Sequence, residues 1–134
     1  MSAVAKPILL LFGLFLLTAE NTSSAQTPTQ AEALCKDAKT QREMNECLAA
    51  AYQKADEELN VFYSSLLKKI GALNFKKLQG AQRAWLKYRD ANCEADSALY
   101  EGGSIQPAMR SGCLERVTRG RIAELHIIYD TGTR

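Results

Sequence analysis

One helical stripe of this chain carries an aromatic ring, a cation and a thiol. Residues 81–93 contain no Gly or Pro, and within them Trp85, Arg89 and Cys93 follow one another at intervals of four. Positions four apart lie on the same face of an α-helix, so these three side chains share one stripe. A guanidinium in such a place either pairs with a carboxylate of a neighbouring helix or stays exposed to bind an anionic ligand.

Other residues that could support catalysis are sparse. His126 is the single histidine and lies in a largely apolar helical segment, which predicts a structural role rather than that of a general base. Glu57 and Glu58 are adjacent, so they point about 100° apart on a helix and do not form a paired-carboxylate site. We therefore expect no enzyme activity and no cofactor.

The first 25 residues have the pattern of a cleavable signal peptide. Lys6 precedes an apolar run, and Ser23 and Ala25 provide small residues before a cut after Ala25. The run is shorter than the roughly 20 residues that span a bilayer. Cleavage removes one basic and one acidic residue, so the net charge stays at +2, too weak to indicate nucleic acid as a partner. We expect a periplasmic or secreted protein without a membrane anchor after cleavage.

Four cysteines lie in the part that cleavage would leave, at Cys35, Cys47, Cys93 and Cys113. An even number of cysteines in a small exported chain indicates two disulfides. Zinc sites and redox-active pairs use closely spaced ligands, and these cysteines include no C-x-x-C pair. We therefore predict no metal site.

Three long helices are predicted beyond a polar leader at residues 26–39, within a helical domain at residues 40–134. The first helix, about 40–70, begins with a capping box formed by Thr40 and Glu43 and continues with apolar residues at steps of three and four. The second, about 74–100, carries the stripe described above. The third, about 108–129, follows a glycine-containing turn. Its expected inward residues are Met109, Cys113, Val117, Leu125 and Ile128.

Short links between long helices place successive helices antiparallel. The fold expected is thus an all-α, antiparallel three-helix bundle stapled by two disulfides. Residues that are equally far in sequence from the first turn then lie at the same height along the bundle. This places Asp56 of the first helix beside Arg89 of the second. This predicts an interhelical ion pair next to Trp85, a core aromatic, and the alternative is an exposed Arg89 that binds an anionic ligand.

The same geometry gathers all four cysteines at one end of the bundle. We favour the pairs Cys35–Cys47 and Cys93–Cys113, because each joins segments that are already close. The rival arrangement pairs Cys47 with Cys93 and ties the first helix to the second.

Charge is distributed unevenly along this bundle. Lysines cluster at the turn between the first two helices, and acidic residues gather at the cysteine end, partly offset by Arg110 and Arg116. The simplest interpretation is solvated helix ends. If the acidic end binds a partner, that partner is expected to be basic.

Two long motifs resemble those of the LprI-type lysozyme inhibitor family. They are T-Q-x-E-M-N-x-C at residues 40–47 and A-Q-R-A-W-L-x-Y-R-D-A-x-C at residues 81–93, accompanied by G-G-S at 102–104 and T-x-x-R at 118–121. The resemblance covers nearly all of the chain after the signal peptide. It implies a small exported helical protein whose partner is a lysozyme.

We therefore expect an exported binding protein that protects peptidoglycan from a lysozyme. The candidate inhibitory loop contains Gly102, Gly103 and Ser104, because these small residues form the turn with the greatest capacity for exposed hydrogen bonding. The alternative is a structural or adaptor module of the bacterial cell envelope with no lysozyme target.

Overall fold

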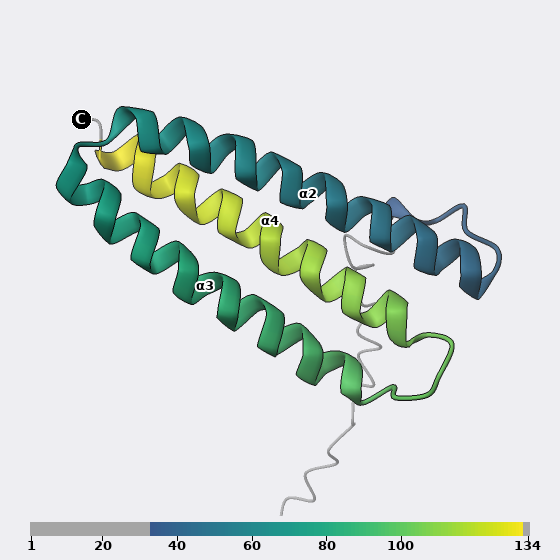
Figure 1. Ribbon diagram of the computed structural model, residues 1–134. Coiled ribbons are helices and arrows are strands. Elements are labelled where there is room, and N and C mark those ends of the chain that lie inside the picture. Colours follow the sequence, from purple (N-terminus) through teal and green to yellow (C-terminus); the bar gives the residue numbers. More distant parts are fainter. Residues whose placement is uncertain (1–32, 133–134) are drawn as a thin grey trace, which may run out of the picture.

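The protein is built from three long helices, as the computed structural model in Figure 1 shows for residues 33–132. They are α2 (Gln41–Lys69), α3 (Ala72–Ala98) and α4 (Gln106–Gly132). Successive helices run in opposite directions, so α2 and α4 run the same way (Figure 1). The predicted all-α fold with two disulfides is confirmed. The predicted signal peptide and half of the leader, residues 26–32, lie outside the described residues.

The start of α2 is fixed by the predicted capping box. The Thr40 hydroxyl accepts the backbone N–H of Glu43 at 3.1 Å, and the Glu43 carboxylate accepts the N–H groups of Lys39 at 2.6 Å and Thr40 at 3.1 Å. These bonds satisfy donors that the first helical turn leaves without partners. At the other end, Gly71 follows α2 with φ −65°, so the chain passes into α3 through extended backbone rather than a left-handed turn.

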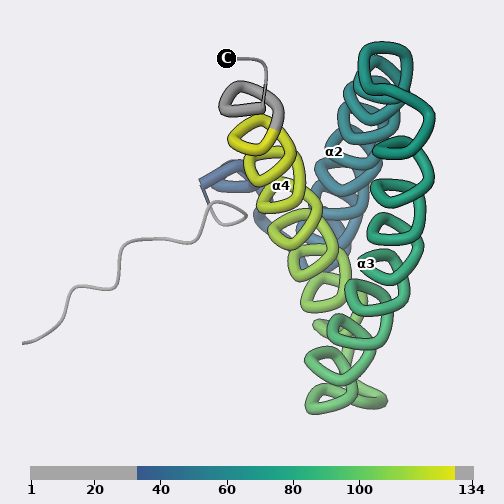
Figure 2. The backbone as a smooth tube through the Cα atoms, turned by 90° about the vertical axis from the view of Figure 1, so that its left-hand side faces the viewer, coloured from purple at the N-terminus to yellow at the C-terminus, as the bar shows by residue number. Residues whose placement is uncertain are grey.

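The helix α4 is the one against which the other two pack, since α2 and α3 have little contact with each other. Figure 2 shows α4 to one side of both. A helix with two partners must bury more than one narrow stripe. The buried residues of α4 are accordingly Ala108, Cys113, Leu114, Glu115, Thr118, Arg121 and Leu125.

One predicted inward position of α4 is wrong. Ile128 is 55% exposed, although it follows the buried Leu125 by three residues. Figure 2 shows α4 separating from α2 and α3 toward its C-terminal end, so the other helices cover Ile128 less than they cover Leu125.

Both favoured disulfides are formed. Cys35 and Cys47 are joined at an S–S distance of 2.02 Å, and Cys93 and Cys113 at 2.07 Å, so the rival Cys47–Cys93 pairing is wrong. The first bond fastens the segment before α2 to that helix, and Cys35 packs with Leu48 in the core. The second bond joins α3 to α4. Disulfides of this kind are typical of exported proteins.

Within residues 33–132, no helix combines the length and apolar character needed to cross a membrane.

The capping box predicts a specific loss of stability in acid. The backbone N–H of Lys39, then that of Thr40, holds the pKa of Glu43 below its ordinary value. A carboxyl group with a depressed folded-state pKa stabilises the fold above its unfolded-state pKa, and this contribution disappears as the pH falls through the folded value. Glu43→Gln should therefore be less stable than the wild type at neutral pH.

The difference between the two proteins should shrink as the solution becomes acidic, because the wild-type carboxyl group is then also uncharged. Urea unfolding of both proteins at a series of pH values measures it. A difference that stays constant from neutral to acidic pH would show that the charge of Glu43 plays no part.

Candidate functional site

The guanidinium of Arg89 joins all three helices. Its Nη1 donates to Asp56 Oδ1 of α2 at 2.8 Å and lies 3.4 Å from Thr118 Oγ1 of α4, while its Nε donates to Asp90 at 2.9 Å. The structure thus contains the Asp56–Arg89 ion pair that the antiparallel arrangement of the helices predicts. Thr118 brings a third helix, α4, into the same contact. The Arg89 side chain is buried, so it does not present its charge to an external ligand.

Aromatic rings cover the faces of this guanidinium. Arg89 Cζ lies 5.2 Å from the centroid of Trp85 and 5.5 Å from that of Tyr52. Contacts at these distances add cation–π attraction to the ion pair. Burial lowers the pKa of Arg89, but the hydrogen bonds that it donates to Asp56 and Asp90 more than offset this effect, and the pKa is raised overall. Arg89 therefore remains a permanent cation in the core.

A second buried cation also lies close to the Trp85 ring. Arg121 Cζ is 5.8 Å from the same ring, and its Nε donates to Gln82 Oε1 at 3.0 Å. Its Nη1 also donates to Glu124 at 2.7 Å. Trp85 thus contacts two arginines and packs against the leucine cluster formed by Leu59, Leu66 and Leu125.

The interior also contains a carboxylate that the periodicity of apolar residues did not reveal. Glu115 is fully buried, and its Oε1 accepts Arg119 Nε at 2.9 Å, while Oε2 has no hydrogen-bond partner among the described residues. Thr118 is equally buried. The T-x-x-R motif, which includes Thr118 and Arg121, is the one sequence pattern that points to these buried polar residues of α4.

The glycine loop between α3 and α4 is ordered by hydrogen bonds. Gly102 has φ 75°, a left-handed conformation that favours glycine. The N–H of Gly103 donates to Tyr100 O at 3.0 Å, and Asn45 Nδ2 of α2 donates to Ser104 O at 3.0 Å. The three predicted loop residues are therefore adjacent and exposed on a loop fixed to the start of α2.

Large apolar side chains flank this loop and face solvent. Leu99 is 83% exposed, and Tyr100 and Ile105 are also exposed. We call these three residues with the glycine loop the loop-end patch. Exposed apolar groups gathered at one place are typical of a protein-binding surface.

The acidic character expected around the loop is largely neutralised. Glu94 pairs with Arg110, and Asp96 lies 3.6 Å from Arg116. Glu46, one turn into α2, pairs with Arg42 at 2.8 Å. One interpretation of the charge pattern was that this end attracts a basic partner. The pairs leave little net negative charge here, so they do not favour that interpretation.

The residues considered for catalysis occupy other places. The ring of His126 stacks on Phe62 with centroids 3.8 Å apart, and Glu58 pairs with Arg119. Among residues 33–128, no three side chains of the metal-binding types gather into a possible site.

These features define a small, disulfide-bonded helical protein whose exposed apolar loop suits protein binding. Residues 31–125 match the family described as lysozyme inhibitor LprI, and the chain belongs to that family. It is also 37% identical over 129 residues to an uncharacterized protein of Rhizobium meliloti (strain 1021), across 87% of this chain and 91% of that protein. No solved structure matches the chain.

The buried position of Arg89 predicts a large effect of its removal on stability. Arg89→Ala should lower the free energy of unfolding by about 3 kcal/mol, the lower end for a broken buried pair, because Asp56 is 35% exposed and water can solvate it. Arg89→Lys should recover only part of the loss, since an ammonium cannot reach both carboxylates and Thr118 as the guanidinium fork does.

Urea unfolding measures both effects, with Arg42→Ala as the matched control. That arginine belongs to an exposed pair that water screens, so its loss should change stability far less than the loss of Arg89. Equal effects of Arg89→Ala and Arg42→Ala would contradict the structural role of Arg89.

Proposed function

We propose that this protein binds a lysozyme in the periplasm or outside the cell and inhibits it, with the loop-end patch as the contact surface. The observation that carries the proposal is membership of the lysozyme inhibitor LprI family over residues 31–125. Two disulfides are consistent with an exported protein.

The loop-end patch supports the proposal through its chemistry. Leu99, Tyr100 and Ile105 offer apolar area that water would leave on binding, and an aromatic ring is the type of anchor enriched in protein interfaces. The glycines between them leave backbone N–H and C=O groups close to the surface. Such a surface could enter a cleft and block access of the polysaccharide.

The hydrogen bonds of the loop make such binding more favourable. A loop that is already ordered loses little conformational entropy when it meets a partner. Asn45 holds Ser104 from α2, and Gly102 N–H reaches Gln106 Oε1 at 3.3 Å. The loop therefore presents one conformation before binding.

Lysozyme inhibition tests the proposal in a turbidity assay. The wild-type protein should slow clearing of a bacterial cell-wall suspension by at least one class of lysozyme. The double variant Leu99→Ser and Ile105→Ser should weaken inhibition at least tenfold, because each exposed apolar side chain contributes roughly 1 kcal/mol or more to a contact.

Val61→Ser provides the matched control, since Val61 is an exposed apolar residue on α2, away from the loop, at 73% exposure. It should inhibit as the wild type does. Inhibition by all three proteins alike would place the contact elsewhere on the molecule. A wild-type protein that inhibits no lysozyme class, even in large molar excess, would reject the function and favour the envelope adaptor.

A further inference from the structure

The part of the α2–α3 hairpin around its turn, residues 59–88, contains several basic residues and no acidic residue. Residues 59–88 contain six Lys or Arg and no Asp or Glu, whereas the rest of residues 26–134 contains ten basic and fourteen acidic residues. The modest overall charge of +2 is thus the sum of +6 on residues 59–88 and −4 on the remainder. A partner that meets the turn end of the hairpin therefore encounters a positive surface.

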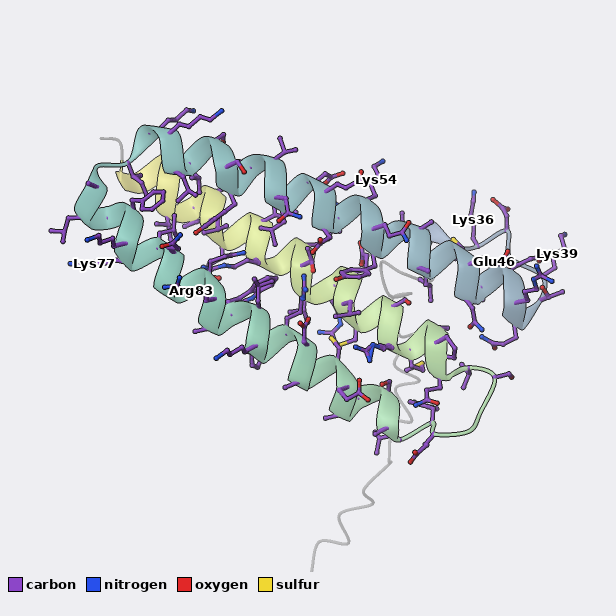
Figure 3. All side chains as sticks on the ribbon, in the orientation of Figure 1. Lys36, Lys39, Glu46, Lys54, Lys77 and Arg83 are labelled. Carbon is purple, nitrogen blue, oxygen red and sulfur yellow. A yellow bond between two sulfur atoms is a disulfide. The ribbon has the colours of Figure 1, made fainter. Side chains whose placement is uncertain are left out.

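Four of these lysines surround the α2–α3 turn. Lys68 and Lys69 lie in the last turn of α2, and Lys76 and Lys77 in the second turn of α3. Figure 1 shows this turn at the end of the bundle opposite the glycine loop, and Figure 3 labels Lys77 there. No ion pair joins Lys68, Lys76 or Lys77 to another of residues 33–128.

Folding does not explain this arrangement. Lys68 and Lys69 suit the negative end of the α2 dipole, but Lys76 and Lys77 lie toward the positive end of α3. The first turn of α3 has no acidic residue, and Gly71 provides no side-chain cap. Four like charges therefore lie around one turn, and a helix dipole compensates only the two on α2. A local arrangement that disfavours the fold is most simply explained by a binding role.

An exposed apolar side chain lies between the two lysine pairs in the sequence. Leu73, in the first turn of α3, is 70% exposed, and the neighbouring Ile70 and Phe75 are only partly buried. An exposed leucine bordered by lysines has the composition of segments that lie in the interface of a bilayer. The apolar group enters the headgroup region, and the ammonium groups meet the lipid phosphates.

We propose that this basic tip, formed by Lys68, Lys69, Leu73, Lys76 and Lys77, docks on a membrane surface that contains anionic phospholipid. Exposed Leu73 favours a bilayer over a soluble polyphosphate, because an apolar side chain gains nothing from phosphate alone. Docking at this end directs the loop-end patch away from the membrane. The proposal does not depend on lysozyme binding.

Vesicle co-sedimentation tests the docking, with protein purified from an exporting host. Wild-type protein should sediment with phosphatidylglycerol-containing vesicles at low ionic strength and stay in solution with pure phosphatidylcholine. Replacing Lys76 and Lys77 by Gln should weaken partitioning about thirtyfold, since each lysine near an anionic bilayer contributes roughly a fivefold factor. The matched control replaces Lys36 and Lys39 by Gln, two exposed lysines at the opposite end (Figure 3), and should bind as the wild type does.

Leu73→Ser distinguishes the membrane from a soluble polyanion. It should weaken sedimentation with the vesicles severalfold and leave binding of inorganic polyphosphate unchanged. Circular dichroism verifies that each variant is folded. Three outcomes would overturn the proposal: wild-type protein that ignores anionic vesicles, equal losses in the two lysine double variants, or a Leu73→Ser variant that binds vesicles as well as the wild type.

Discussion

The buried guanidinium of Arg89 is the contact on which the arrangement of the three helices depends. α2 and α3 each pack on α4 but have little contact with each other, and Arg89 of α3 reaches Asp56 of α2 and Thr118 of α4. A cation in this position requires partners at fixed places, so it restricts how the helices can slide or rotate. The Cys93–Cys113 disulfide then holds α3 to α4 one turn further along.

Because this contact lies in the middle of the bundle, the two ends are available for other tasks. One end presents an apolar loop bordered by neutralised charges, and the other presents lysines around Leu73 (Figure 1). These surfaces suit different partners: a folded protein at the loop and an anionic bilayer at the tip. A short helical protein could in this way hold a binding loop at a defined distance from a membrane.

Much of this fold could be predicted from the sequence, because its determinants are local or follow from antiparallel helices. Helix ends, disulfide pairs and the level positions of Asp56 and Arg89 require only spacing and chain direction. The burial of Glu115 and Thr118 could not be predicted, since apolar periodicity does not detect polar residues on a helix with two partners. The exposure of Ile128 likewise depends on how α4 diverges from its neighbours, which no periodicity encodes.

A double-mutant cycle on Asp56 and Arg89 tests the central role of this ion pair most directly. Urea unfolding of Asp56→Ala, Arg89→Ala and the double variant gives the coupling energy between the two side chains. The structure predicts a favourable coupling above about 1 kcal/mol, because the 2.8 Å contact is shielded on the arginine side and supported by aromatic rings. A coupling energy within about 0.3 kcal/mol of zero, with the single losses simply adding, would contradict it.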